Sequence, residues 1–241
     1  MRVAQLTDLH FGNMTPLALQ RGAVALVNAS KPDLTVLTGD FVGRGLGHLE
    51  SLSEVLGRIE GRKIAVLGNH DHWSGAEGVR EALRKANIEV LDNAWTRLGE
   101  GDNALALVGM DDFGTGHHDQ LRSTAGLRGM PALGLSHNPE GAPLLWGRGV
   151  GLVLSGHTHG GQVHVPRYTP KLWRSLLHVR YLNGWYEALG HQVYVSPGVG
   201  STLMPFRYGK PAMREVAILD LVGGPVVAPE LGPLVHLDRA S

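Results

Sequence analysis

The sequence predicts an α/β fold in which helices cover a largely parallel β-sheet. Two observations support this prediction. Short apolar runs rich in β-branched residues recur along the chain, as expected for buried strands, and segments with the periodicity of amphipathic helices separate the first of these runs. Alternating strands and helices are typical of parallel sheets, which bind their ligands at the carboxyl ends of the strands. The length of 241 residues favours one domain over residues 1–241.

The predicted elements follow one another in chain order. Strands are expected over eight runs, namely residues 3–6, 34–37, 64–67, 104–108, 132–135, 152–154, 193–195 and 216–219. Helices are expected over residues 17–29, 49–60 and 78–86, because Leu, Val and Ala recur there every three to four residues. From residue 151 onward the helical signal fades, which favours a second sheet or an antiparallel edge. Residues 222–241, with their Gly-Pro pairs, are expected to form a loosely packed tail.

The composition excludes several classes of protein. Cysteine is absent, which excludes disulfides, thiolate zinc sites, iron–sulfur clusters and a cysteine nucleophile. The 22 basic residues balance the 22 acidic ones, so specific nucleic-acid binding is not expected. The start of the chain lacks the apolar run of a signal peptide, and no stretch approaches the ~20 apolar residues of a membrane span. A cytoplasmic protein is therefore expected.

Acidic, amide and imidazole side chains follow five of the predicted strands. Each of them alone is also typical of a turn or a solvated loop. Their common place at the ligand-binding edge of the expected sheet is better explained by a metal site. The candidate ligands are Asp8, His10, Asp40, Asn69, His137, His157 and His159. Seven ligands are too many for one ion and suit two ions that share a bridging carboxylate, an arrangement that acts in displacement at phosphorus.

These residues resemble the signature of the calcineurin-like metallophosphoesterases, which reads Asp-x-His, Gly-Asp, Gly-Asn-His-Asp/Glu, His and Gly-His-x-His. All five blocks occur here in order, and the resemblance covers roughly residues 1–220. It implies a four-layer αββα sandwich of two mixed β-sheets flanked by helices. It also implies that a first ion is held by Asp8, His10, Asp40 and His159, and a second by Asp40, Asn69, His137 and His157.

The resemblance further implies a mechanism. A hydroxide that bridges the two ions attacks phosphorus in line, and His70, which is not a ligand, protonates the leaving oxygen as the general acid. Manganese is the metal that the family favours, although the ligand types suit Fe, Zn, Ni and Co as well. The enzyme expected is a metal-dependent phosphodiesterase.

Further matches and one departure place the chain within the family. Residues 160–162, 195–200 and 205–207 resemble a bacterial branch of membrane-associated phosphodiesterases, some of which cleave lipid-linked pyrophosphates. The loop that reads Gly-Asp-x-x-Asp-Arg-Gly in protein phosphatases lacks its second Asp here, where Gly43 stands. That Asp orients the catalytic His in phosphatases, and Asp71 is a candidate substitute. Arg44 matches the phosphatase arginine and suits a phosphoryl group, although an exposed loop arginine explains it equally well.

A segment over residues 166–191 is predicted to be a cap or loop on the substrate side. It combines five Trp and Tyr residues with four basic residues and the single acid Glu187. This composition suits a lipid headgroup or a nucleotide, and it equally suits a loop whose aromatic residues pack on the core. Trp173 and Arg174 are the candidate substrate-binding residues.

The substrate expected is therefore a small or lipid-linked phosphodiester, with peripheral membrane contact as a further expectation. Two alternatives stay open. One is a pyrophosphatase that acts on a nucleotide-linked lipid or sugar resembling UDP-diacylglucosamine. The other is a non-catalytic metal-binding scaffold, which the intact ligand set and His70 disfavour.

Overall fold

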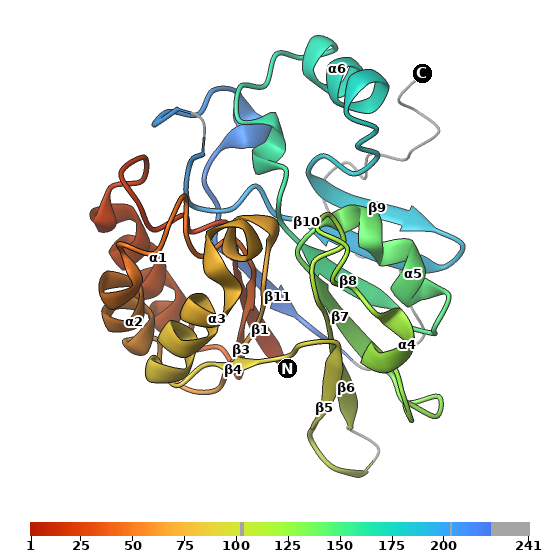
Figure 1. Ribbon diagram of the computed structural model, residues 1–241. Coiled ribbons are helices and arrows are strands. Elements are labelled where there is room, and N and C mark those ends of the chain that lie inside the picture. The colour runs from red at the N-terminus through yellow and green to blue at the C-terminus, as the bar shows by residue number, and fades with distance from the viewer. Residues whose placement is uncertain (102–103, 203, 223–241) are drawn as a thin grey trace.

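The computed structural model describes residues 1–101, 104–202 and 204–222. Two β-sheets pack face to face, and helices cover the outer face of each sheet (Figure 1). Both sheets are mixed, because each contains parallel strands with an antiparallel strand at an edge. The predicted αββα sandwich is therefore confirmed.

The first sheet is built from the N-terminal part of the chain and one C-terminal strand. Its strands are β1 (Arg2–Leu6), β2 (Leu34–Thr38), β3 (Lys63–Val66), β4 (Glu89–Val90) and β11 (Ala217–Asp220). Their order is β11-β1-β2-β3-β4, with β11 antiparallel to β1 and the others parallel. The helices of this half are α1 (Leu17–Ser30), α2 (Leu49–Gly57) and α3 (Asn69–Lys85).

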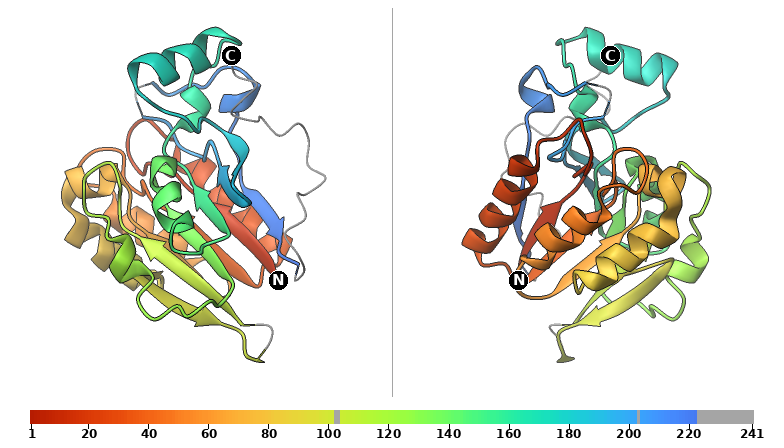
Figure 2. Two further views of the ribbon diagram at one scale, coloured as in Figure 1. Left: turned by 90° about the vertical axis from the view of Figure 1, so that its right-hand side faces the viewer. Right: turned by 60° about the vertical axis from the view of Figure 1, so that its left-hand side comes forward.

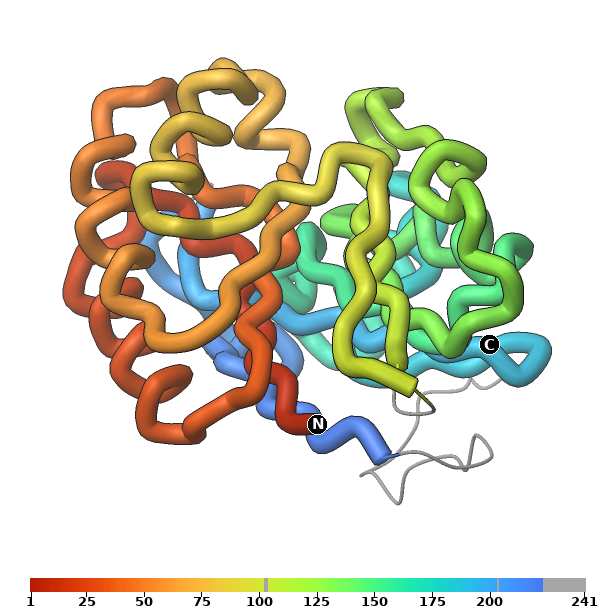
Figure 3. Tube along the Cα trace, turned by 90° about the horizontal axis from the view of Figure 1, so that it is seen from below, coloured from red at the N-terminus to blue at the C-terminus, as the bar shows by residue number. Residues whose placement is uncertain are grey.

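The second sheet follows in the chain. Its strands are β5 (Ala94–Leu98), β6 (Leu105–Met110), β7 (Ala132–Ser136), β8 (Leu152–Ser155), β9 (Gly184–Ala188) and β10 (His191–Val195), in the order β5-β6-β7-β8-β10-β9. The helices are α4 (Gln120–Ser123), α5 (Ala142–Trp146) and α6 (Tyr168–Leu176), with short 3-10 turns η2 (Pro139–Gly141), η3 (His159–Gly161) and η4 (Lys210–Ala212). Seen from below, helices flank the sheets on both sides (Figure 3).

Alternation of side chains along the strands creates three buried layers. Val3 and Val36 point between the two sheets, where they join a cluster that includes Leu107. Their neighbours Ala4 and Leu37 point to the opposite face and pack in the cluster beneath the helices of the first half. This period of two is what a strand buried on both faces requires. The strands are thereby held rigidly, and their carboxyl ends provide a fixed edge for a site.

The eight strands predicted from the sequence are all present. Of the two alternatives for the chain after residue 151, the antiparallel edge is confirmed, by β9 in the second sheet and by β11 in the first, whereas the second sheet itself starts earlier. The second sheet begins at β5 and not at residue 151. Strands β6 and β7 are parallel and buried like those of the first sheet, so their hydrophobic pattern does not reveal which sheet they join. Strands β4, β5 and β9 were missed, as were α4, α5 and α6.

Two predicted helices have different bounds. The helix expected over residues 49–60 ends at Gly57, and the one expected over 78–86 is the last part of α3. Helix α3 begins at Asn69 because Gly68 is extended and Asp71, three residues later, accepts a hydrogen bond from the Gly68 N–H. This contact is one half of a capping box, since glycine has no side chain to accept the return hydrogen bond. Residues that looked like a turn are thus the first turn of a helix.

The remaining predictions about organisation concern the last part of the chain. The segment 166–191 contains the helix α6 and also β9, which pairs with β10 in the second sheet. Most of the predicted tail, residues 223–241, lies outside the described residues. In the described part of the chain, no helix is both long enough and apolar enough to cross a membrane.

An ion pair joins α3 to the segment after β6. His72 Nε2 lies 2.8 Å from Asp111 Oδ1, and both side chains are buried. Burial alone would lower the pKa of His72, but the hydrogen bond and charge of Asp111 outweigh it and raise the pKa above the usual range. The pKa of Asp111 is lowered, because the same contacts outweigh its own burial.

We expect this pair to make stability depend on pH. An imidazole whose pKa is raised by folding contributes stability at pH values below its pKa in the unfolded chain, which is about 6.5. This contribution is lost as the pH rises through the pKa of the imidazole in the folded protein. A carboxyl group whose pKa is lowered by folding contributes stability above pH ~4, and this contribution is lost as the pH falls through the lowered pKa. His72→Gln should therefore cost about 1.5 to 3 kcal/mol near pH 5.5. The difference from the wild type in urea unfolding should shrink at pH 9, and a constant difference would contradict the assignment.

Candidate metal centre

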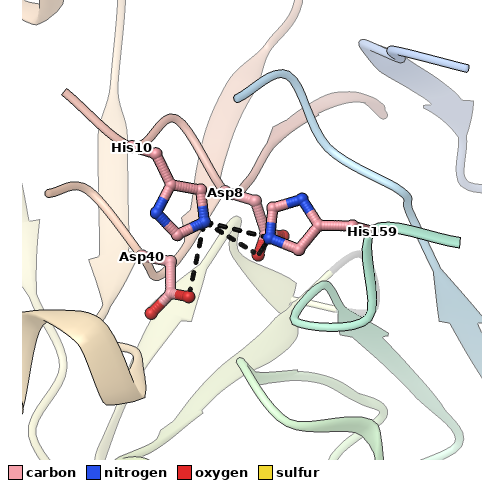
Figure 4. Close-up of side chains that lie close together, drawn as sticks. All are labelled: Asp8, His10, Asp40 and His159. Atoms are coloured by element: carbon pink, nitrogen blue, oxygen red, sulfur yellow. Dashed lines mark hydrogen bonds and ion pairs between the residues drawn. The ribbon is translucent and has the colours of Figure 1, made fainter. Parts of the chain in front are cut away.

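Four of the predicted ligands converge where β1, β2 and β8 end. Figure 4 shows the side chains of Asp8, His10, Asp40 and His159 pointing toward one another from the loops that follow these three strands. Each offers a ligand atom, and these atoms all lie within 4.8 Å of one another. All four residues are buried. The strand-end positions identified in the sequence thus meet in space.

The nitrogen and oxygen atoms that could bind a metal lie close together in this first group. His10 Nε2 lies 3.0 Å from His159 Nε2 and 3.6 Å from Asp40 Oδ2. His159 Nε2 lies 3.4 Å from Asp8 Oδ1. The two imidazoles and two carboxylates therefore direct their ligand atoms to one common point.

A second group shares Asp40 with the first. It contains Asp40, His137 and His157, whose ligand atoms again lie within 4.8 Å of one another. His137 Nε2 lies 3.3 Å from Asp40 Oδ2 and 3.2 Å from His157 Nδ1. The side-chain oxygen of Asn69 lies 3.1 Å from the same His137 nitrogen, so it reaches this group as well. Asp40 is thereby positioned as the carboxylate that both groups use.

The chemistry of these groups fits two divalent cations. Imidazole, carboxylate and amide donors are ligands of first-row transition metals, and a shared carboxylate is typical of two-metal sites. The other ring nitrogen of His137 lies 2.7 Å from the Thr38 carbonyl, and that of His10 lies 3.3 Å from the Val42 carbonyl. Such contacts orient a ligating imidazole and leave its Nε2 lone pair for the metal. The structure thus brings together all seven ligands predicted from the sequence.

The backbone is strained at most of these positions. A positive φ is uncommon for residues other than glycine and costs roughly 1 to 2 kcal/mol each. Such strain clusters at functional sites, where the surrounding structure maintains it. Five ligand residues adopt φ between 43° and 75°, namely Asp8, His10, Asp40, His157 and His159.

Two glycines of the signature blocks allow the carboxylates to approach the backbone. A β-carbon at Gly156 would overlap Asp8 Oδ2, and one at Gly68 would overlap Asp40 Oδ1. The space beside Gly156 is used by Asp8, which accepts a hydrogen bond from the His157 N–H at 3.0 Å. These glycines are therefore required by close packing.

The imidazoles of the site strongly lower the pKa values of its two carboxylates. Burial would raise the pKa of Asp40, but the neighbouring imidazoles of His137 and His10 outweigh it and hold the pKa well below its usual range. Burial likewise opposes the ionisation of Asp8, but the imidazoles of His159 and His10 outweigh it and lower the pKa of Asp8. Both carboxylates are therefore ionised at neutral pH and available to a cation.

His70 lies at the start of α3, beside the ligands but outside both ligand groups. Its backbone N–H donates to Asp40 Oδ1 at 2.9 Å, which ties it to the shared carboxylate. Its ring centroid lies 4.9 Å from that of His10. Nδ1 lies 2.6 Å from the carbonyl oxygen of Gly43, so it donates there and Nε2 stays available for a ligand or substrate.

The expectation that Asp71 orients His70 is wrong in this structure. The Asp71 carboxylate accepts hydrogen bonds from the backbone N–H groups of Phe41 and Val42, in addition to that of Gly68. It thereby ties the loop after β2 to the start of α3. Burial, with the nearby charge of Asp40 adding to it, raises the pKa of Asp71 to about 7. The partner of His70 is the Gly43 carbonyl, at the position where phosphatases carry the second Asp.

Sequence reasoning missed two residues at the site. Arg207 Nη2 lies 2.7 Å from His159 Nδ1, and Arg207 Nε donates to the Gly200 carbonyl at 2.8 Å. Burial lowers the pKa of Arg207 to about 10. Trp73 is 71% exposed, and its ring centroid lies 5.1 Å from that of His70. The signal for Trp73 was available, because residues three apart on a helix are neighbours.

The predicted substrate-binding residues lie around the ligand groups and not within them. Arg44 is exposed in the loop after β2, next to Gly43. Trp173 packs on η3, close enough that a β-carbon at Gly161 would lie 3.4 Å from its Nε1. Arg174 is exposed on α6. Of the aromatic residues in segment 166–191, Tyr181 and Tyr186 belong to the core beneath the second sheet.

Comparison with known proteins agrees with this geometry. The model of the calcineurin-like phosphoesterase family matches residues 1–161. Phosphodiesterase YaeI of Escherichia coli strain K12 is 33% identical over 227 residues, which cover 92% of this chain and 82% of that protein. Metallophosphoesterase YkuE of Bacillus subtilis strain 168 is 29% identical over 214 residues, which cover 86% and 74%.

A solved structure shows the same fold. The crystal structure of TT1561 from Thermus thermophilus superposes with a TM-score of 0.56 at 12% sequence identity. The alignment covers 82% of this chain and 89% of that one. The αββα arrangement is thus shared at low sequence identity.

Proposed function

The chain belongs to the calcineurin-like phosphoesterase family of metal-dependent phosphoric ester hydrolases, and we propose that the ester it cleaves is a phosphodiester. The observation that carries the proposal is His70, held at the edge of two ligand groups that share Asp40. The name of the relative YaeI, a phosphodiesterase, agrees with it.

The ligands divide between two ions as the two groups do. Asp8, His10, Asp40 and His159 would hold the first, and Asp40, Asn69, His137 and His157 the second. When bound, a pair of divalent ions such as Mn²⁺ supplies positive charge for the phosphoryl oxygens and lowers the pKa of water. The buried, preorganised side chains of this chain fix where that charge lies.

His70 supplies the proton. Its Nδ1–H is committed to the Gly43 carbonyl, so a protonated ring has its second proton on Nε2. From Nε2 the proton passes to the oxygen of the leaving alcohol, which makes that alcohol a better leaving group. The backbone carbonyl holds the ring in orientation without adding the negative charge that a carboxylate partner would bring.

A diester fits the surroundings of His70 better than a monoester. The second ester group of a diester adds a substituent that can pack on an aromatic ring, and Trp73 offers an exposed ring beside His70. A diester carries one negative charge fewer than a monoester dianion, so it needs fewer cationic contacts. We assign Arg44 to the phosphoryl group, and Trp173 and Arg174 to the part of the substrate beyond it.

The expected result is a protein with about two bound transition-metal ions that hydrolyses bis-p-nitrophenyl phosphate roughly tenfold or more faster than p-nitrophenyl phosphate. Elemental analysis and assays with Mn, Fe, Zn, Ni and Co measure both quantities. Faster monoester hydrolysis would reverse the assignment. Faster cleavage of a nucleotide-linked pyrophosphate than of any diester would instead support the pyrophosphatase, the second candidate, and absence of bound metal would exclude both.

A further inference from the structure

Helix α6 has an apolar face that the rest of the described chain leaves in solvent. Thr169 and Trp173 pack inward, against Gly161 of η3. Beside them, on the neighbouring stripe of the helix, lie three apolar residues that are spaced one turn apart. These three residues, and the apolar residue that follows the helix, are exposed to solvent instead. Their exposed fractions are 75% for Tyr168, 52% for Leu172, 68% for Leu176 and 57% for Leu177. Exposed leucines in such a row are unusual on a soluble surface.

A second segment continues this apolar surface. Phe206, Tyr208 and Met213 are 58%, 64% and 65% exposed and lie on either side of η4. The two segments are joined through residues 162–164, because Tyr208 N donates to the Gln162 carbonyl and the Tyr208 carbonyl accepts from His164 N. Both views in Figure 2 place α6 and the blue turn η4 at the same end of the molecule. We call these seven residues, with the basic residues around them, the α6 surface.

The two segments that form the α6 surface carry charge of one sign. The sequence contains no Asp or Glu between Glu140 and Glu187, or between Glu187 and Glu215. The same stretch carries basic residues on both segments, of which Arg167, Lys171, Arg174 and Lys210 are exposed. On α6, Lys171 and Arg174 lie on the side of the helix opposite to Leu172 and Leu176. An apolar stripe with cations on the polar side of the same helix is typical of helices that lie in the plane of an anionic membrane.

The α6 surface is joined directly to the metal centre. Both of its segments pack on η3, which begins with the ligand His159. Thr169 and Trp173 contact the Gly161 side, and the backbone of Pro211 and Ala212 leaves no room for a β-carbon at Gly160. A partner bound to this surface is therefore held within one short turn of a metal ligand.

We propose that the α6 surface docks on an anionic lipid bilayer and so presents the metal centre to a phosphodiester carried by a lipid. Charge complementarity selects this occupant. A two-fold dimer through the same surface would bring two positively charged surfaces together without an acidic residue of either segment between them, which is unfavourable. The docking itself rests on the α6 surface, and only the lipid-linked substrate rests on the proposed function.

The test is cosedimentation of the full chain with vesicles. We expect binding to phosphatidylcholine vesicles that contain roughly 30% phosphatidylglycerol, weaker binding at high salt, and little binding to phosphatidylcholine alone. The variant Leu172→Glu/Leu176→Glu should bind at least about tenfold more weakly, because two carboxylates enter the apolar face. Its rate on soluble bis-p-nitrophenyl phosphate should stay within about twofold of the wild type, since neither leucine is part of the site.

The matched control is Leu26→Glu/Leu121→Glu, which adds the same charge at leucines that are 62% and 61% exposed on α1 and α4. It should bind vesicles like the wild type, apart from a small loss of affinity because the two added carboxylates make the net charge of the protein more negative. The proposal is overturned if the wild type does not bind anionic vesicles, or if both double variants lose binding equally. Loss of a concentration-dependent dimer in the Leu172 variant, without vesicle binding by the wild type, would identify a second copy as the occupant. Vesicle binding without diester hydrolysis would leave the docking intact and reject the proposed function.

Discussion

Replacing His70 with alanine is expected to lower kcat for an alkyl phosphodiester by roughly 10² to 10⁴ while both metal ions stay bound. His70 lies outside both ligand groups, and its ring is oriented by the Gly43 carbonyl. Removing the ring therefore removes a proton donor without removing a ligand. Elemental analysis of the variant and its steady-state kinetics measure the two quantities separately.

The leaving group distinguishes a proton donor from a residue that stabilises charge. The loss should be small for p-nitrophenolate, which leaves without protonation, and large for an alkoxide. Asn69→Ala is the matched control, because Asn69 is adjacent on the same helix turn and reaches His137 Nε2. It should lower the occupancy of the second ion, and added metal should restore part of its activity. An equal loss for both leaving groups, or loss of metal from His70→Ala, would mean that His70 is a ligand or a charge stabiliser.

The ligand positions could be predicted from the sequence because they obey a local rule. Asp8, Asp40 and His157 each come directly after a short buried strand, and parallel strands bring their carboxyl ends to one edge. The two sheets face each other, so the edge of the second adds His137 and His157 to the edge of the first. An error in dividing the strands between sheets therefore did not change the predicted site.

The contacts that orient the side chains of the site could not be predicted from the sequence, for a physical reason. The partner of His70 is a backbone carbonyl, which every residue has, so Gly43 gave no sign of its role. Arg207 reaches His159 across 48 positions of the chain through a loop without periodicity. Asp71 looked like a catalytic carboxylate, although its position three residues after Gly68 is the position of a capping residue.

The α6 surface could not be predicted from the sequence either, for a related reason. Its sequence contains Pro170 and lies in a stretch of loops, so no helix was expected there. Once residues 168–176 are helical, Tyr168, Leu172 and Leu176 fall on one stripe, a relation that depends on the 3.6-residue period. The aromatic and basic composition was visible in the sequence, but the face that it forms was not.

Asp40→Asn is expected to lower both metal binding and activity strongly. Asp40 is the one residue common to both ligand groups, and its carboxylate is fully buried and ionised. The amide keeps the size of the side chain and an oxygen that can accept from the His70 N–H, so the helix start is preserved. What is lost is the negative charge, and with it several kcal/mol of transition-state stabilisation, or roughly 10³-fold in kcat.

The occupancy of each ion in a set of variants then tests the sharing of Asp40. Dialysed Asp40→Asn should retain less of both ions, whereas His159→Ala should lose chiefly the first and His137→Ala chiefly the second, since each imidazole belongs to one group. Elemental analysis with thermal unfolding in the presence of excess chelator separates metal loss from loss of the fold. If Asp40→Asn keeps one ion fully and loses only the other, Asp40 does not bridge, and each group must draw its negative charge from a carboxylate of its own.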